Sequence, residues 1–291
     1  MKSTKLILGF ALALTILSCS KQEEKNGKIS TEDAKVSAQI DAMNDDVSSI
    51  VEEQEASTYS DAISGKTADL GFSKLTNCAT VTRVPAFGTA PNVGDTVTKT
   101  IDFGQSCTLD SGNVVSGIIV ITFVYDPGAT SHTITYSFDN FIHNGIEYDG
   151  DKTFTRTIIT TAANPTEHPQ VTMTIDVTAT LPSGGVYHRV GTRTREIIEG
   201  FGNAILADNV YEITGSWVTT TPSGATQNSN ITIPLKVKMS CAALNKPLIV
   251  YGIITIVTNN SNASLNFGDG TCDNLAVLTV NGNSYDIVIG N

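Results

Sequence analysis

The sequence predicts an all-β protein with one amphipathic helix near the amino terminus, and three observations support this prediction. From Cys78 onward, apolar and polar residues alternate with a period of two, as in strands that bury one face. The alternating runs are separated by turn residues, including Asn-Gly, the strongest short hairpin signal. The chain is rich in Thr, Val, Ile, Gly and Asn and poor in Leu, Glu and Lys, which is typical of strands and turns.

The amino terminus has the pattern of a lipoprotein signal peptide. Lys2 and Lys5 provide a positive start, and the apolar run from Leu6 to Leu17 has twelve residues, too few for a membrane-spanning helix. Ser18 is a small residue that permits cleavage before Cys19. We therefore expect residues 1–18 to be removed and the sulfur of Cys19 to be lipidated. Two or three acyl chains, palmitate among them, would hold the protein on a membrane.

Residues 19–29 are expected to form a lipidated tether. The segment from Ser20 to Glu24 resembles the acidic export signal that directs lipoproteins of Bacteroidota-type bacteria to the outer leaflet of the outer membrane. A solvated charged linker has the same composition and is the alternative. We expect an outer-membrane location facing the cell exterior, with the membrane as a partner through the lipid anchor.

A helix and its linker are predicted over residues 30–65. Ser30 to Asp33 supplies a hydroxyl cap and carboxylates for the first turn. Five apolar residues then follow at spacings of four, three, four and three, on one stripe of a helix that runs to about Glu55: Val36, Ile40, Met43, Val47 and Ile50. The stripe fits a coiled-coil seam or a helix packed on its own domain, and a length below three heptads favours the second interpretation.

The charge distribution argues against nucleic acid as a partner. The chain has 29 acidic and 18 basic residues, for a formal net charge of −11. Residues 19–65 hold 4 Lys and 11 Asp or Glu, which contributes −7 of that charge. No basic stripe is present for nucleic acid or for anionic lipid headgroups, so we expect neither as a partner.

Residues 66–291 are predicted to form one β domain of about a dozen strands joined mainly by hairpins. Four hairpins are marked by their turns: Asn144-Gly145, Pro182 to Gly185, Pro222 to Gly224 and Asn281-Gly282. The predicted strands are Val114 to Tyr125, Thr130 to Ile142, Ile146 to Ile159, Val171 to Leu181, Val186 to Ile198, Val210 to Thr221, Gln227 to Met239, Leu248 to Val257, Ser264 to Phe267, Leu275 to Val280 and Tyr285 to Ile289.

These strands predict a large antiparallel meander, which can form a curled sheet, a barrel or a two-sheet sandwich. A membrane-spanning barrel also has long alternating strands. The lipid anchor, the paired cysteines and the many Thr and Asn at outward positions argue against one.

Four cysteines beyond Cys19 predict two disulfides in an exported protein. Similar phrases precede Cys107 and Cys272, which favours one of the three possible pairings: Cys78–Cys107 and Cys241–Cys272. Each bridge would close a loop of about 30 residues and stabilise the fold by about 3–4 kcal/mol. No Cys-x-x-Cys pair or neighbouring His supports a zinc site.

Several phrases of the chain resemble a family of uncharacterised Bacteroidota lipoproteins. They are Ile101 to Cys107, Ser116 to Thr122, Phe138 to Ile146, and the closing Phe-Gly-Asp-Gly-Thr-Cys-Asp-Asn phrase from Phe267 to Asn274. The similarity extends over nearly the whole mature chain, including the amino-terminal helix. It implies the same address and fold, and it implies no functional residue because the family has no assigned activity.

Two rows of charged residues are the main candidates for a functional site. One row shares a strand face and could receive an anionic sugar or phosphate group: Tyr187, Arg189, Arg193 and Arg195. The other row alternates along a different strand and could cleave a glycosidic bond or bind Ca²⁺: Glu147, Asp149 and Asp151. We favour a third interpretation, in which the two rows lie near each other as exposed ion pairs.

Other candidates are weaker. Asp269 and Asp273 could bind Ca²⁺, but a disulfide-pinned turn in which they accept backbone N–H groups explains them better. Thr96 lies in an Asp-Thr-Val phrase that resembles the O-glycosylation acceptor of Bacteroidota. No nucleophile elbow or phosphate-binding loop occurs. The histidines lie on different strands or loops without ligand spacing: His132, His143, His168 and His188.

We therefore expect no cofactor and no catalytic residue. The favoured function is that of a non-enzymatic, lipid-anchored surface protein with a binding or structural role, whose ligand would be a glycan or another surface protein. The alternatives are a lipid carrier with an apolar concave face and a glycan hydrolase that uses the acidic row.

Overall fold

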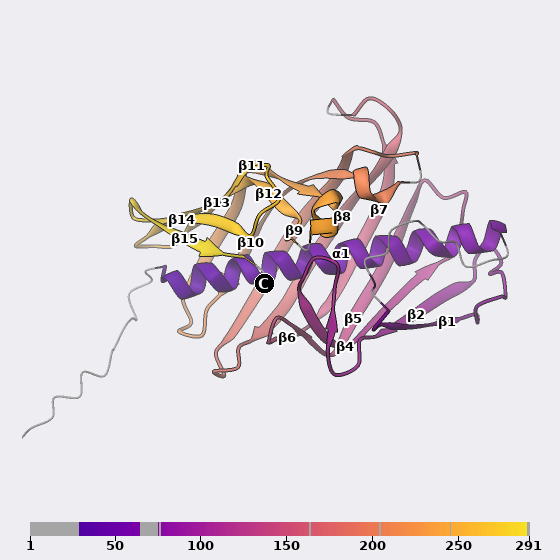
Figure 1. Cartoon of the computed structure of the whole chain (residues 1–291), viewed down its shortest axis with the longest axis horizontal. Helices are drawn as coiled ribbons and strands as arrows, with labels where there is room; N and C mark the ends of the chain where they lie inside the picture. Colours follow the sequence, from indigo (N-terminus) through magenta and orange to yellow (C-terminus); the bar gives the residue numbers. More distant parts are fainter. Residues whose placement is uncertain are drawn as a thin grey trace, which may run out of the picture.

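The structure of the protein is a computed structural model that describes residues 29–64, 75, 77–162, 164–203, 205–244 and 246–289. The predicted signal peptide, Cys19 and most of the predicted tether lie outside the described residues. One long helix, α1 (Thr31–Ser64), lies along the long axis of the molecule and crosses the strands of a single sheet (Figure 1). Within the described residues, no helix combines the length and the apolar character needed to span a membrane.

The start of α1 is fixed by the predicted cap. The backbone N–H of Asp33 donates to Ser30 Oγ at 3.0 Å, and the backbone N–H of Ser30 donates to Asp33 Oδ2 at 3.2 Å. This reciprocal pair satisfies donors at the helix start that have no intrahelical partner. The helix runs nine residues beyond the predicted end at Glu55.

Fifteen strands are present in the described part of the chain. The first three precede the strands named from the sequence: β1 (Thr80–Val84), β2 (Thr96–Asp102) and β3 (Cys107–Thr108). The others match predicted strands within a few residues: β4 (Val114–Val124), β5 (Ser131–His143), β6 (Ile146–Asp149), β7 (Asp151–Ile159), β8 (His168–Thr180), β9 (Val186–Glu199), β10 (Val210–Thr220), β11 (Thr226–Lys238), β12 (Ile249–Val257), β13 (Asn262–Asp269), β14 (Leu275–Val280) and β15 (Asn283–Val288). Two short 3-10 helices complete the structure: η1 (Leu206–Asp208) and η2 (Met239–Leu244).

All fifteen strands belong to one antiparallel sheet, which confirms the all-β prediction. The pairing path runs from β1 to β15 in near-sequential order, with β3 beside β4, and with β7 between β5 and β8. The end strands β1 and β15 each pair with one neighbour, so of the three predicted architectures the curled open sheet is the one observed.

Local turn chemistry determines the hairpins. Asn144 and Gly145 both have positive φ, at 49° and 80°, and they join β5 to β6. Asn281 and Gly282 repeat this geometry between β14 and β15, at 48° and 85°. Positive φ at both central residues is what the favoured two-residue hairpin turn requires. These two hairpin predictions are confirmed.

The single strand predicted from Ile146 to Ile159 is wrong, because it is broken at Gly150 into β6 and β7. Gly150 has a φ of 131°, and a Cβ there would lie 2.2 Å from the backbone oxygen of Asp176 on β8. Only glycine permits this close approach of two backbones. The break lets the two halves pair with different stretches of β5 and β8.

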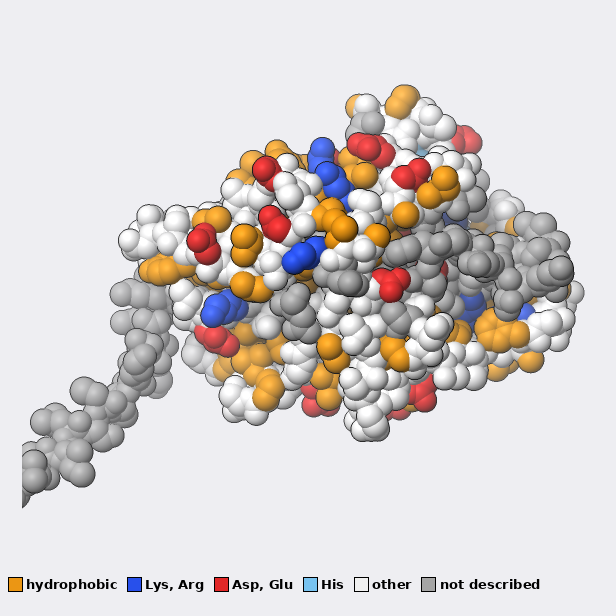
Figure 2. Space-filling model, viewed as in Figure 1, with side chains coloured by type: hydrophobic (Ala, Val, Ile, Leu, Met, Phe, Trp, Pro, Cys, Tyr) orange, Lys and Arg blue, Asp and Glu red, His pale blue; other side chains and the backbone are white. Residues whose placement is uncertain are grey.

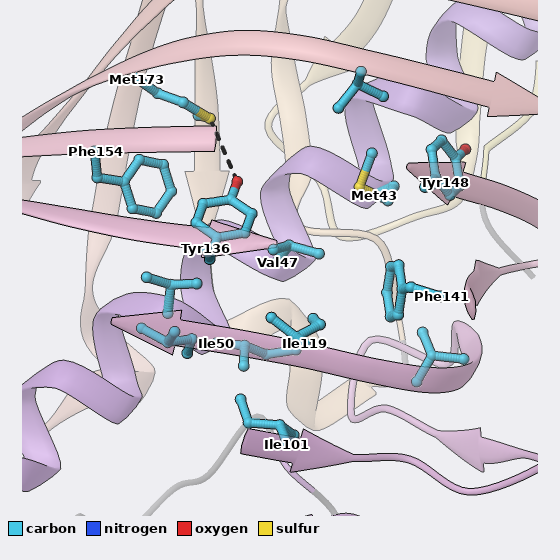
Figure 3. Close-up of a cluster of buried hydrophobic side chains, with 14 of the residues drawn as sticks. Met43, Val47, Ile50, Ile101, Ile119, Tyr136, Phe141, Tyr148, Phe154 and Met173 are labelled. Atoms are coloured by element: carbon cyan, nitrogen blue, oxygen red, sulfur yellow. Dashed lines mark hydrogen bonds between the residues drawn. The ribbon is translucent and has the colours of Figure 1, made fainter. Parts of the chain in front are cut away.

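The apolar stripe of α1 packs inside the protein. Ile40, Met43 and Val47 have no exposed surface and belong to one cluster with sheet side chains such as Phe141 and Tyr148 (Figure 3). The sheet of the same chain covers the stripe, so the prediction of a helix packed on its own domain is confirmed. The coiled-coil seam is wrong.

A second cluster forms at the amino-terminal end of α1. Ala34 and Ala38 of the helix pack with buried residues of the later strands, including Leu235, Leu265 and Leu278. Both halves of the sheet therefore bury apolar surface against the same helix, and the sheet curls around it.

Both predicted disulfides are present. Cys78 and Cys107 have Cα atoms 5.4 Å apart, and Cys241 and Cys272 have Cα atoms 5.3 Å apart, within the range of bridged cysteines. The first bridge ties the segment before β1 to β3, and the second ties η2 to the loop after β13.

The substitution Gly150→Ala is expected to lower the free energy of unfolding by about 1–3 kcal/mol, because a Cβ at this position meets the backbone of β8 in an unfavourable φ region. Urea-induced unfolding measures the change. Gly128→Ala is the control, since the nearest atom to its added Cβ is 3.5 Å away. Equal stability of G150A and the wild type would contradict the close approach.

Candidate functional site

A polar stripe runs along α1 beside the apolar one. Ser37, Asp41, Asn44 and Ser48 are spaced by four, three and four positions, and each follows a member of the apolar stripe by one residue. All four side chains are buried. A helix with one buried stripe normally exposes its polar face to water, so the polar stripe must find its partners on the sheet.

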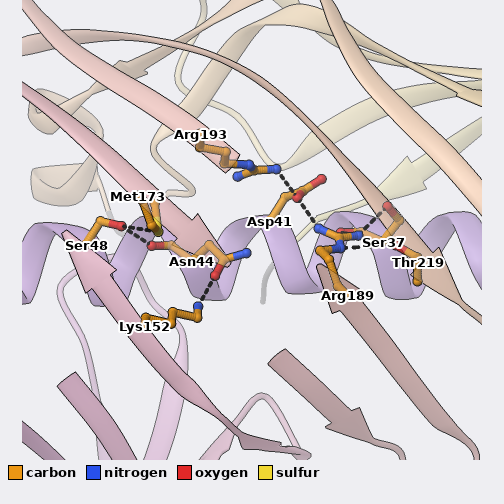
Figure 4. A network of polar contacts seen from close by, with 9 residues as sticks. All are labelled: Ser37, Asp41, Asn44, Ser48, Lys152, Met173, Arg189, Arg193 and Thr219. Atoms are coloured by element: carbon orange, nitrogen blue, oxygen red, sulfur yellow. Dashed lines mark hydrogen bonds and ion pairs between the residues drawn. The ribbon is translucent and has the colours of Figure 1, made fainter. Parts of the chain in front are cut away.

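The arginine row of β9 provides those partners. Asp41 lies between two guanidinium groups and accepts a hydrogen bond from Arg189 Nη1 at 2.6 Å and another from Arg193 Nη2 (Figure 4). Arg189 Nη2 also donates to Ser37 Oγ at 2.7 Å. Asp41 and Arg189 have no exposed side-chain surface.

The arginine row also lies against aromatic rings. The Cζ atoms of Arg189 and Arg193 are 4.9 Å and 4.3 Å from the ring centroid of Trp217 on β10. Both distances are within the range of cation–π attraction. Tyr187, at the start of the row, donates from its hydroxyl to Asp33 Oδ1 at 2.9 Å.

The prediction that these four residues form an exposed ligand-binding face is therefore corrected. Tyr187 and the three arginines point inward and bind side chains of α1. The strand alternation predicts that they share a face, but that face is the buried one, because Ile197 belongs to it. The helix carboxylates lie about 150 positions earlier in the chain, so the local sequence around β9 does not indicate these partners.

Two buried lysines extend the same interface. Lys99 Nζ, on β2, donates to the backbone oxygen of Gln54 at 2.5 Å and to Ser57 Oγ at 2.7 Å. Lys152 Nζ, on β7, donates to Asn44 Oδ1 (Figure 4). Burial lowers the pKa of Lys152 well below its usual value, and the nearby guanidinium groups of the arginine row add to this effect.

Each of the four histidines contacts a carboxylate. His143 Nε2 lies 2.9 Å from Asp46 Oδ2 inside the protein, and His132 pairs with Glu55, so both contact α1. His168 Nε2 lies 3.1 Å from Glu196 Oε1, and the exposed His188 lies 2.7 Å from Asp176. The histidines are spread over separate pairs. Among the described residues, no group of three or more side chains could hold a metal ion.

A cavity of about 360 Å³ lies between the later turns of α1 and the sheet. Its helix side includes Ser49, Glu52, Glu53, Glu55, Ala56 and Tyr59. Its sheet and loop side includes Arg156, Val171, Arg195, Ile197, Phe201, Tyr211 and Met239. The volume lies within the range of small-molecule sites. The sequence contains no local motif for this cavity, because its walls come from segments far apart in the chain.

Glu52 and Arg195 form an ion pair in this cavity. Arg195 Nη1 lies 3.6 Å from Glu52 Oε1, and the Cζ atom of Arg195 lies 3.7 Å from the ring centroid of Tyr211. Burial raises the pKa of Glu52, while the charge of Arg195 opposes this shift. Burial also raises the pKa of Tyr211 to about 12.

The acidic row does not join this site. Glu147 and Asp149 are exposed, while Tyr148 between them points into the core. They line neither the cavity beside α1 nor a second groove of about 540 Å³ on the outer face of β9–β12. The side chain of Asp151 lies outside the described part. The interpretation that the two charged rows form exposed ion pairs is wrong, because the arginines are buried against α1.

The remaining candidates occupy turns and surfaces. Asp269 Oδ1 accepts hydrogen bonds from the backbone N–H and the hydroxyl of Thr271, which lower the pKa of Asp269. Asp273 Oδ1 accepts from the N–H of Leu275 at 3.0 Å. These bonds are those of the predicted turn. Thr96 is exposed at the start of β2, and its glycosylation stays a prediction.

Lys and Arg side chains are scattered singly over the face seen in Figure 2, without a continuous basic stripe. Comparison with protein-family models, with curated proteins and with solved structures finds no match to this chain.

The substitution Asp41→Ala is expected to lower the free energy of unfolding by about 3–5 kcal/mol, because it leaves two buried guanidinium groups without their shared carboxylate. Asp176→Ala is the matched control: it removes a carboxylate from the exposed pair with His188 and should cost less than about 1 kcal/mol. Chemical denaturation of both variants measures the difference. Similar losses of unfolding free energy in the two variants would contradict a larger contribution from the buried ion pairs of Asp41.

Lys152 predicts a pH dependence of stability. Its lowered pKa means that the folded protein binds fewer protons at this site than the unfolded chain does, at pH values between the lowered pKa and the usual value of 10.5. The free energy of unfolding should therefore rise with pH across this window. Lys152→Met should remove that rise, which unfolding curves from about pH 7 to about pH 10 measure. Parallel pH profiles for K152M and the wild type would overturn this assignment.

Proposed function

We propose that the chain is a lipid-anchored outer-membrane protein whose β domain binds a small amphipathic molecule without catalysing a reaction. The signal-peptide pattern ending at Cys19 and the acidic segment after it support the address. Two disulfides fit a compartment outside the cytoplasm. The resemblance to Bacteroidota lipoproteins agrees with this proposal.

The cavity beside α1 is the observation that supports binding most directly. It has an apolar wall that includes Val171, Ile197 and Met239, and it faces the carboxylate of Glu52. A cavity with mostly apolar walls and a few convergent polar groups is the usual form of a small-molecule site.

Carriage of lipid on an apolar concave face fits this structure less well. The helix α1 occupies the concave face, and the side chains beneath it include Lys99, Lys152 and Arg189. A hydrocarbon chain would have to displace the helix and leave these charges without partners. We therefore place the ligand in the cavity at the later turns of α1.

Fewer observations support a glycan hydrolase. Two of its three proposed carboxylates, Glu147 and Asp149, are exposed on β6 and line neither of the two cavities described above. The side chain of the third, Asp151, lies outside the described part of the chain. Two catalytic carboxylates need a cleft in which a sugar ring lies between them.

The proposed lipid anchor predicts that one variant loses both lipidation and membrane attachment. Cys19→Ala should abolish incorporation of radiolabelled palmitate and release the protein from the outer membrane, because the sulfur of Cys19 is the proposed acceptor. Ser20→Ala is the neighbouring control and should retain both. Digestion of intact cells with an external protease then reports the leaflet. Label that persists in C19A would refute the anchor.

Ligand binding is tested with the full-length protein in nanodiscs. Calorimetric titration with hexanol, corrected with empty nanodiscs, should give saturable binding in the wild type. Ala56→Trp should abolish it, because Ala56 lines the cavity at its exposed edge and a Trp side chain there would take space that the ligand needs. Ala90→Trp, at an exposed position, is the control. Binding that survives in A56W would place the ligand elsewhere.

A further inference from the structure

Three residues that line the cavity carry a buried polar group without a hydrogen-bond partner among the described residues: Glu52, Tyr59 and Arg195. The groups of the ion pair, Glu52 and Arg195, are complementary to each other. One is an acceptor, Glu52 Oε1, which lies 3.6 Å from Arg195 Nη1 but accepts no hydrogen bond. The other is a donor, Nε of Arg195, a residue whose side chain is 3 % exposed. Buried polar groups are nearly always paired, so an unpaired acceptor and an unpaired donor on neighbouring residues of one cavity wall need an explanation.

Each terminal nitrogen of Arg195 already has a hydrogen-bond partner. Its Nη1 and Nη2 atoms donate to Ser49 Oγ at 3.3 Å and 3.2 Å. The ring of Tyr211 covers a face of the guanidinium. The free Nε–H lies in the plane of the guanidinium group, where a ring stacked on its face does not satisfy it.

The charged groups around the cavity are close to balance. Three carboxylates, those of Glu52, Glu53 and Glu55, face the guanidinium groups of Arg156 and Arg195. Glu55 pairs with His132, and Glu53 has interactions of its own. A ligand with a full charge of either sign would therefore meet a like charge in the wall.

We propose that the cavity binds an uncharged molecule with an apolar body and a hydroxyl group, whose hydroxyl donates to Glu52 and accepts from Arg195. This inference rests on the proposed function and identifies the class of its ligand. A hydroxyl supplies one donor and two acceptor lone pairs, so it can satisfy both groups at once. An ammonium group has no acceptor for Arg195, and a carboxylate has no donor for Glu52.

The apolar wall fits the rest of such a molecule. Pro169, Val171, Ile197 and Met239 line the cavity together with Phe201, which is 46 % exposed. An aliphatic chain or ring placed there would be removed from water at a gain of about 25 cal/mol per Å².

The test compares four probes of similar size on the full-length protein in nanodiscs: hexanol, hexylamine, hexanoate and methyl pentyl ether. The affinity for hexanol should be about tenfold higher, or more, than the affinity for each other probe, because every other head group leaves a buried donor or acceptor unpaired. The ether has an acceptor but no donor, so it isolates the bond to Glu52.

Variants at Glu52 distinguish its roles. Glu52→Leu should lower the affinity for hexanol about tenfold or more, to a value close to the affinity for the ether, because the hydrogen-bond acceptor is removed. Glu52→Gln retains an acceptor of the same shape and should keep hexanol binding, while the affinity for hexanoate rises because a negative charge is removed. Glu147→Leu, on the exposed strand β6, is the control and should bind all four probes as the wild type does.

The outcomes separate the inference from the proposed function. Absence of binding by all four probes would overturn both. Hexylamine or hexanoate binding as tightly as hexanol would leave the proposed cavity in place but refute the hydroxyl ligand. Equal binding of the ether and hexanol, or an E52L variant with unchanged affinity for hexanol, would refute donation to Glu52.

Discussion

The structure depends on the burial of charged side chains between α1 and the sheet. Transfer of a guanidinium or carboxylate group out of water costs several kcal/mol per ion, and only close pairing with good hydrogen bonds offsets that cost. Asp41 contacts Arg189 and Arg193 together through Oδ1, while its Oδ2 accepts no hydrogen bond from the described residues (Figure 4). A shift of the helix by one turn would keep the apolar stripe on the sheet but would separate these partners. The ion pairs therefore specify the register of α1 on the sheet, whereas the apolar stripe by itself would tolerate several positions.

The same constraint shapes the rest of the fold. Because α1 is buried on its polar stripe as well as on its apolar one, strands from both halves of the sheet must surround it, and the sheet curls. The cavity lies where this packing is incomplete, next to Glu52 and Arg195. Since Arg195 also donates to Ser49 on α1, a ligand that contacts its Nε–H is coupled to the docking of the helix.

Much of the fold could be predicted because its signals are local. The hairpins at Asn144-Gly145 and Asn281-Gly282 follow from turn chemistry, and the start of α1 follows from Ser30 and Asp33. The break at Gly150 could not be predicted in this way, because its cause is the backbone of Asp176, which belongs to another strand.

The candidate site was less predictable. Charged residues usually lie at the surface. For this reason the sequence favours an exposed face for the row from Arg189 to Arg195. The four-three-four spacing of Ser37, Asp41, Asn44 and Ser48 was the available signal for a second buried stripe. Its pairing with β9 depends on contacts across about 150 residues, and such contacts cannot be read from a single sequence. The cavity has the same origin, since α1 and β7–β10 form its walls.

Native-state hydrogen exchange tests most directly whether α1 is an integral part of the fold. If the buried ion pairs lock the helix into the sheet, the amides from Ile40 to Val51 will exchange only through global unfolding. Their opening free energies will then match those of β8 and β9 within about 1 kcal/mol. Exchange of these helix amides through a lower-energy opening, while the strands stay protected, would contradict this account.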